Sequence, residues 1–286
     1  MRFSLRLLAL TALLAAGCGS SAAVECDDGR FCPAGTSCGV GGVCLVEPGS
    51  CAEFDENAAC LLDGEIGYCV AGSCAPSVGV TGTIGQALEG GPRDVGLANA
   101  LVTAVDREFV SGVTTNETGV FVLPVVANDS DLVIEARAAG FVRVRSRSLA
   151  IGDEAFAVNG NPEDPLSTLS VADLVDFIRA IGEEPSPSSS GAVVVRIRPP
   201  NADISAVLDD ENGPRALYFA GRIPDADKTS TMGSPVVSFP VVAPGSYTLV
   251  FTKGVCRATG ADMPTPVTAT VVAGVLTNLG TFQCQP

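Results

Sequence analysis

The sequence predicts a mainly β protein in which a disulfide-rich N-terminal module precedes two antiparallel β-sandwich domains with one connecting helix. Three observations lead to this class. Eight cysteines lie between residues 26 and 74, short alternating apolar segments recur after residue 78, and one stretch near residue 170 has helical periodicity. The chain has 286 residues, 47% of them hydrophobic, which suggests about two packed domains.

The first 17 residues have the form of an export signal. Arg2 and Arg6 precede the apolar residues 7–16, and small residues follow. A bilayer-spanning helix needs ~20 apolar residues, about twice the length of this run. We therefore expect residues 1–17 to be a signal peptide.

Two processing sites compete at the end of this signal. The triplet Ser21-Ala22-Ala23 fits the small-x-small pattern of ordinary signal cleavage. Directly after the apolar segment, Leu14-Ala15-Ala16-Gly17-Cys18 resembles the lipobox of bacterial lipoproteins, with Ala15 where Leu is commoner. We favour the lipobox. The resemblance implies that Cys18 becomes the first mature residue and carries acyl chains such as palmitate, and that residues 18–25 form a lipidated tether.

The same resemblance implies a location. Stable anchoring needs more than one acyl chain, each buried methylene contributing ~0.8 kcal/mol, and bacterial lipoproteins meet that condition. Gly19 stands where lipoproteins kept in the inner membrane often carry Asp. We therefore expect an exported protein anchored by its N-terminal acyl chains in the outer membrane or at the cell surface of a Gram-negative bacterium.

The ten cysteines after Cys18 are expected to form disulfides. No Cys-x-x-Cys pair and no histidine occur in the chain, which argues against zinc or redox sites, whereas export favours disulfides. In the module over residues 26–74, two sets of four cysteines read as a degenerate repeat, and nine pairings remain open if each set closes on itself. The sets are Cys26, Cys32, Cys38 and Cys44, then Cys51, Cys60, Cys69 and Cys74.

The final two cysteines, Cys256 and Cys284, lie in the last domain and most simply pair with each other. Closing a loop of this length stabilises the fold by ~3.5 kcal/mol in the chain-entropy model.

Residues 78–152 alternate apolar and polar positions in five short segments, as a β-sandwich requires. In residues 131–137, Leu132, Ile134 and Ala136 share one face, while Glu135 and Arg137 take the other. These segments span residues 78–84, 99–105, 119–126, 131–137 and 141–151.

In the last of these segments, Arg143, Arg145 and Arg147 alternate with Val142 and Val144. We expect the three arginines to point outward as a solvated face, with a basic recognition face as the sharper alternative.

The stretch TNETGVFVL at residues 115–123, followed by Ala139-Gly140-Phe141, resembles the carboxypeptidase regulatory-like, transthyretin-type sandwich. The resemblance implies a tight turn at Gly119, a core position for Phe121 and a non-catalytic companion domain. The usual Pro-Gly-x-Tyr element is replaced here by ANDSDLVI. It occurs instead in residues 191–286, as Pro244-Gly245-Ser246-Tyr247, so we expect a second sandwich there on the same plan.

Residues 153–190 are expected to hold a loop, one helix and a linker. Ser170 and Asp173 have capping-box spacing, and Gly182 can end the helix. We expect the apolar stripe to pack on a neighbouring sheet, with partner binding as the alternative. The stripe consists of Val171, Leu174, Val175, Ile178 and Ile181.

The composition excludes several kinds of chemistry. Without histidine there is no Ser-His-Asp triad, and neither Lys228 nor Lys253 follows a Ser-x-x-Lys spacing. A net charge of -15 argues against nucleic acid. The run Asp209-Asp210-Glu211 could offer oxygen ligands to calcium, but it lacks a known cage spacing and reads as an acidic turn.

These observations predict a lipid-anchored, non-catalytic cell-surface protein, without cofactor or metal, that acts as a structural or protein-binding display module. Its partners are the membrane and a surface protein or glycan. The alternative is an accessory glycan or cell-wall binder, or a hydrolase that uses two carboxylates ~5 to 10 Å apart in an open cleft.

Overall fold

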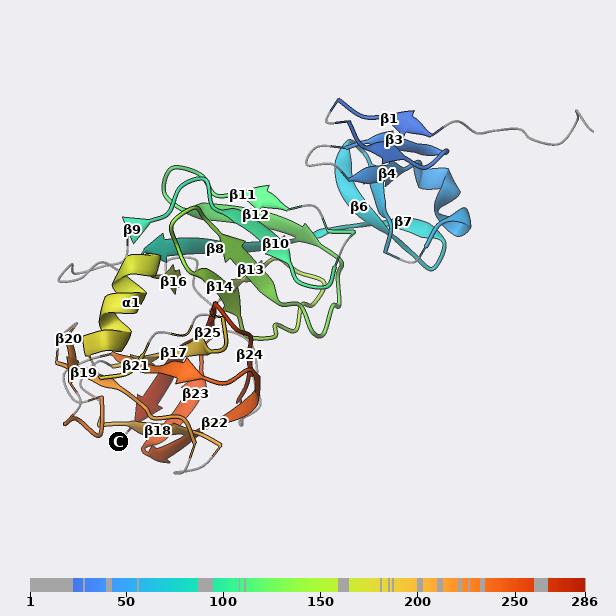
Figure 1. Ribbon diagram of the computed structural model, residues 1–286. Helices are drawn as coiled ribbons and strands as arrows, with labels where there is room; N and C mark the ends of the chain where they lie inside the picture. Colours follow the sequence, from blue (N-terminus) through green and yellow to red (C-terminus); the bar gives the residue numbers. More distant parts are fainter. Residues whose placement is uncertain are drawn as a thin grey trace, which may run out of the picture.

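The computed structural model confirms a mainly β protein, with a cysteine-rich module and two sandwiches (Figure 1). None of the helices in the described ranges is long and apolar enough to cross a bilayer. The structure describes residues 23–285 apart from 28, 40–42, 56, 87–94, 108, 111, 159–164, 181, 185, 187, 200–202, 210–212, 221–222, 226, 232–234 and 260–266.

The cysteine-rich module is a five-stranded sheet in the order β3-β4-β5-β6-β7, with the β1-β2 pair beside it. In both sets of four cysteines, the first bonds to the third and the second to the fourth. The two sets therefore share one connectivity, as a repeat requires. The elements are β1 (Val24–Glu25), β2 (Phe31–Cys32), β3 (Thr36–Cys38), β4 (Cys44–Val46), the 3₁₀ helix η1 (Pro48–Glu53), β5 (Ala59–Leu62), β6 (Glu65–Val70) and β7 (Ser73–Pro76).

The first sandwich packs a sheet centred on β8 against strands β10, β11, β13 and β14. Phe121, the expected core residue, is 2% exposed. Gly119 adopts φ +79° in the turn before it, where the side chain of Asn116 accepts hydrogen bonds from two backbone amides. The strands are β8 (Val78–Gln86), β9 (Val95–Gly96), β10 (Leu101–Ala104), β11 (Val113–Thr114), β12 (Val120–Val125), β13 (Ile134–Arg137), β14 (Arg143–Ser146), β15 (Phe156–Ala157) and β16 (Leu166–Thr168).

The second sandwich packs β17, β21, β23 and β25 against the three-stranded sheet β18-β22-β24. Its buried core includes Val193, Phe239, Ala269 and Phe282. A separate β19-β20 hairpin lies beside it. The strands are β17 (Gly191–Arg198), β18 (Ser205–Leu208), β19 (Tyr218–Ala220), β20 (Ile223–Asp225), β21 (Val236–Val242), β22 (Gly245–Lys253), β23 (Val255–Ala258), β24 (Val267–Val271) and β25 (Val275–Gln285).

The two sandwiches share one eight-stranded sheet, because β25 pairs in parallel with β14 of the first and with β17 of the second. Only the first part of β25, residues 275–278, pairs with β14. Beyond the positive-φ Gly280, the same edge of β25 pairs with β23 instead. The C-terminal strand therefore joins the two domains by backbone hydrogen bonds.

The two sandwiches bury opposite faces of this shared sheet. Residues directly opposite on neighbouring strands project to the same face, so the register defines two rows. One row faces the first core over β10, β13 and β14, and the other faces the second core at β17. The first row is Val102, Ala136, Val144, Leu276 and Ala192, and the second is Thr103, Glu135, Arg145, Thr277 and Val193.

The single described α-helix, α1 (Val171–Ala180), covers the part of the shared sheet where residues of the first row no longer belong to the first core. Leu174 packs against Val142, Ala192 and Leu276. The helix begins as expected, because the Asp173 amide donates a hydrogen bond to the Ser170 hydroxyl, which in turn donates to the Asp173 carboxylate. Gly182 follows the helix at φ +78°. The prediction that this helix packs on a sheet is confirmed at Leu174, whereas Val171 at the start of the predicted stripe is 49% exposed. Ile181 lies outside the described residues.

Candidate functional site

Most of the residues singled out for chemistry take no part in a common site. Cys18, Asp210 and Glu211 lie outside the described residues. Asp209 sits at φ +64°, and its carboxylate accepts a 2.6 Å hydrogen bond from the amide of Thr248. This carboxylate thus stabilises its own strand end, as an acidic turn does.

The cysteines are paired. Cys256 on β23 and Cys284 on β25 stand directly opposite each other and form a disulfide. In the module, the sulfur atoms of Cys26, Cys32 and Cys38 lie within 4.8 Å of one another, but each belongs to a disulfide. The same holds for the trio Cys51, Cys60 and Cys74. A thiol bound in a disulfide offers no thiolate to a metal.

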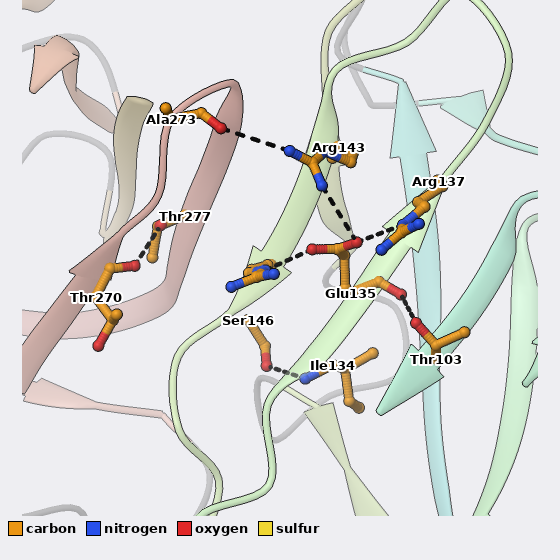
Figure 2. A network of polar contacts seen from close by, with 10 residues as sticks. Thr103, Ile134, Glu135, Arg137, Arg143, Ser146, Thr270, Ala273 and Thr277 are labelled. Carbon is orange, nitrogen blue, oxygen red and sulfur yellow. Dashed lines mark hydrogen bonds and ion pairs between the residues drawn. The ribbon is translucent and has the colours of Figure 1, made fainter. Parts of the chain in front are cut away.

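The most developed polar site is centred on Glu135, on the face of β13 turned away from the first core (Figure 2). Its side chain is 1% exposed. The Nε of Arg145 lies 2.5 Å from one carboxylate oxygen, and the Nε of Arg137 contacts the other. The Nη1 of Arg143 lies 4.0 Å from that second oxygen. One buried acid is therefore surrounded by three bases from two neighbouring strands.

These arginines determine the protonation state of Glu135. Burial acts most strongly and tends to raise the pKa of the carboxyl group. The hydrogen bonds from Arg145 and Arg137 together outweigh it, so the pKa of Glu135 is held below its usual value. Glu135 is consequently ionised at neutral pH, and the four side chains carry a net charge of about +2.

The site also touches the second sandwich. Arg143 donates a 3.5 Å hydrogen bond to the carbonyl of Ala273, in the turn between β24 and β25 (Figure 2). Thr277, opposite Arg145 in the register, donates to the carbonyl of Thr270 on β24. The charged cluster thus lies beside the point where the sheet β18-β22-β24 of the second sandwich begins to cover the shared sheet.

The arginines do not all point into solvent, which corrects the expectation of a uniformly solvated face. The side chain of Arg143 is 40% exposed and that of Arg145 is 19% exposed. Arg147 is 3% exposed as a whole residue. Strand β14 ends at Ser146, so the alternation that predicts an outward side chain no longer applies at Arg147.

Arg147 occupies the junction where β25 exchanges β14 for β23. Its backbone amide donates to Asn278, while its guanidinium donates 3.0 Å to the carbonyl of Leu279 and 3.3 Å to that of Thr259. Burial lowers the pKa of this guanidinium. A buried arginine therefore ties a carbonyl of β25 and the carbonyl that directly follows β23 to the end of β14.

A second junction holds the cysteine-rich module on the first sandwich. Tyr68 on β6 is 1% exposed and belongs to the core of the first sandwich together with Leu45 and Ala59. Its ring meets Phe109 edge to face at 5.9 Å. Burial raises the pKa of the Tyr68 hydroxyl. No sequence pattern identifies Tyr68 as an interdomain residue, because the residues beside it in the sequence are typical of any β-strand.

A hollow beside Arg137, lined by Ile84, Leu97, Ala136 and Phe141 among others, has no room for a water molecule.

No protein-family model and no curated protein matches the chain. Among solved structures, it is similar to a type II cohesin-X-dockerin complex of Acetivibrio cellulolyticus, with 13% identity, 36% of this chain and 73% of that one covered, and a TM-score of 0.26. A streptococcal ancillary pilin is matched at 12% identity over 75% of this chain and 59% of that one, with a TM-score of 0.19. The shaft pilin of Lactobacillus rhamnosus GG is matched at 10% identity over 73% and 98%, with a TM-score of 0.20. These TM-scores do not assign the chain to any of those groups.

Proposed function

We propose that this is a lipid-anchored, non-catalytic cell-surface protein that acts as a structural or protein-binding display module. The observation that carries the proposal is the continuity of the molecule. Tyr68 joins the module to the first sandwich, and β25 joins the two sandwiches within one sheet. Interfaces of this kind hold the domains in a fixed spatial arrangement, which suits a protein that displays a surface to a partner.

Five disulfides support an exported location. They join Cys26 to Cys38, Cys32 to Cys44, Cys51 to Cys69, Cys60 to Cys74 and Cys256 to Cys284. Bonds of this kind persist in oxidising compartments such as the periplasm and the cell surface.

The proposed anchor lies close to the first folded element. Cys18 precedes Cys26, the first disulfide cysteine, by eight residues. An extended chain covers at most about 3.5 Å per residue, so this tether spans at most about 28 Å. An acylated Cys18 therefore places the cysteine-rich module next to the membrane, with the sandwiches beyond it.

The proposal of a non-catalytic role rests on the chemistry available. The chain lacks histidine altogether, and the buried acid Glu135 is held in ion pairs with arginines. A carboxylate so paired has a lowered pKa and is a poor proton donor at neutral pH.

Metabolic labelling with palmitate in a Gram-negative host tests the anchor. We expect the wild-type chain to take up label and to fractionate with the outer membrane. Cys18→Ser should lose the label, and Gly19→Asp should keep the label but remain in the inner membrane. Equal labelling of the wild type and Cys18→Ser would refute lipidation.

Protease treatment of intact cells tests the display role. We expect a protease that is added to intact, unlysed cells to cleave the sandwiches of the wild-type protein. Protection of the whole chain until the outer membrane is broken would place the protein in the periplasm and contradict surface display.

A further inference from the structure

We propose that Leu101, Arg137, Arg143 and Arg145, here named the arginine surface, form a docking site for a carboxylate-rich segment of a partner protein. The proposal rests on the display function above and specifies the chemistry of the partner. The four residues share the outward face of neighbouring strands β10, β13 and β14, above the buried carboxylate of Glu135.

The orientation of the guanidinium groups is the first argument. Arg137 and Arg145 each contact Glu135 through Nε. Among the described residues, neither has a further hydrogen bond from its Nη atoms. Each guanidinium group is thereby held in place by Nε, and its two Nη atoms remain available for hydrogen bonds. This pair of Nη atoms can bind a carboxylate through two parallel hydrogen bonds.

The balance of charge is the second argument. Three arginines surround one acid, and the register that pairs Glu135 with Arg145 also brings Arg137 opposite Arg143. Like charges directly opposite on a sheet destabilise it. A bound carboxylate relieves this repulsion. The side chains of Arg137 and Arg143 are 56% and 40% exposed, so an incoming anion can reach them.

The surroundings favour a peptide. Leu101, 42% exposed, stands directly opposite Arg137 on β10 and offers an apolar contact beside the charges. The other register neighbours on this face are Thr103, Thr114, Val275 and Thr277. None of these neighbours is aromatic, so a sugar ring has no stacking partner among them. A mixed apolar and basic surface suits an acidic peptide segment.

Fluorescence anisotropy with a labelled hexaglutamate peptide tests the site on the full chain in a non-ionic detergent. We expect saturable binding that weakens as salt is raised from about 50 to about 300 mM, because exposed charges are screened. A hexaglutamine peptide should not bind. The double variant Arg137→Gln/Arg143→Gln should bind the hexaglutamate about tenfold more weakly.

A matched control removes two charges elsewhere. Arg179→Gln/Arg257→Gln changes two exposed residues on the other side of the shared sheet. Arg179 lies on α1, which covers that opposite face. Arg257 follows Cys256 on β23 and points to the opposite side of the strand from it. We expect this variant to bind like the wild type. Equal loss in both variants would mean attraction by net charge alone and would overturn the site, as would unchanged binding by Arg137→Gln/Arg143→Gln.

Polygalacturonate supplies a carboxylated glycan as the competing ligand. Binding of polygalacturonate to the arginine surface without binding of hexaglutamate would overturn the peptide assignment. Failure to bind either probe would overturn the docking site as well. Neither result bears on lipid anchoring or surface display, which the palmitate and protease experiments decide separately.

Discussion

The hydroxyl group of Tyr68 in the cysteine-rich module donates a 2.7 Å hydrogen bond to the backbone carbonyl of Pro124 in the first sandwich. Residue 124 lies on β12, fifty-six positions further along the chain, so this bond closes an interface between two units of the fold. The ring of Tyr68 is buried with it. The hydroxyl group of Tyr68 is hydrogen-bonded and its apolar ring is buried, and together these contacts fix the orientation of the module on the first sandwich.

Removing the polar tip and the ring separates these two contributions. We expect Tyr68→Phe to lower the free energy of unfolding by about 1 kcal/mol, the net value of one hydrogen bond. Tyr68→Ala should cost about 3 to 5 kcal/mol because the ring also leaves a cavity. Denaturant unfolding measures both. Tyr247→Phe is the control, since its hydroxyl bonds Ala243 at an exposed position; an equal loss there would contradict an interface role.

Arg147 is expected to stabilise the union of the two sandwiches. In Arg147→Met, the carbonyls of Leu279 and Thr259 lose charged donors, and we expect a loss of about 2 kcal/mol. Amide hydrogen exchange should accelerate first in β23 and at the middle of β25. Arg179→Gln, at an exposed helix position, should leave both readings unchanged. Unaltered exchange in β23 for Arg147→Met would show that the junction does not depend on this side chain.

The stability of the protein should be constant from about pH 5 to 8 and fall in acid. No histidine titrates in the neutral range. The pKa of Glu135 is lowered by Arg145 and Arg137 despite burial, and a hydrogen bond from Arg107 lowers that of Asp129. A carboxyl group with a lowered folded pKa contributes stability above its unfolded pKa of about 4, and loses it as pH falls through the folded value.

Glu135→Gln isolates one part of this pH dependence. At pH 7 we expect the variant to be less stable by about 3 kcal/mol, because three arginines lose their shared counter-charge. The melting temperatures of the variant and the wild type should converge as the pH falls through the lowered folded pKa of Glu135, because below it the carboxyl group is protonated in both states. Asp176→Asn, whose carboxylate is exposed, should follow the wild type throughout. A constant difference at every pH would contradict an ion-pair origin.

The disulfide between Cys256 and Cys284 closes a loop over a sequence separation of 28 residues. Cys256→Ser/Cys284→Ser should lower the free energy of unfolding by about 3.5 kcal/mol in the chain-entropy model. The corresponding variant of Cys51 and Cys69 should instead loosen the module, measured by limited proteolysis, and spare the second sandwich. Loss of the second sandwich in that variant would mean that the units unfold as one.

Peptide mapping without reduction tests the repeat connectivity. We expect crosslinked peptides that join Cys26 to Cys38, Cys32 to Cys44, Cys51 to Cys69 and Cys60 to Cys74. Pairing of neighbouring cysteines, Cys26 with Cys32 for example, would contradict the shared first-to-third and second-to-fourth pattern.

Local chemistry made several elements predictable. The helix needed only a Ser170 and Asp173 cap, a periodic apolar stripe and Gly182, all within one short segment. The alternation of Ile134 and Ala136 with Glu135 likewise placed the first two in the core. Patterns with a period of two or 3.6 act over a few residues, and sequence inspection reads them directly.

Glu135 shows where such patterns stop. Alternation correctly turns it away from the core, and a residue so placed is normally solvated. Its burial comes from Arg137 and Arg145, which cover it from the same strand and the next. The spacing of one acid before a run of alternating arginines could have indicated an ion-pair cluster, but burial depends on how the side chains converge.

The sequence by itself determined the mainly β class, the helix and its caps, the division into cysteine sets and the absence of histidine chemistry, because each depends on composition or on neighbours in the chain. Only the tertiary structure decided which cysteines of the N-terminal module pair, that Tyr68 and Arg147 occupy junctions, and that β25 merges two sandwiches into one sheet with opposite faces buried. These features join residues up to 132 positions apart. Strand pairing over such separations is selected by the packing of the whole fold, and no local periodicity encodes it.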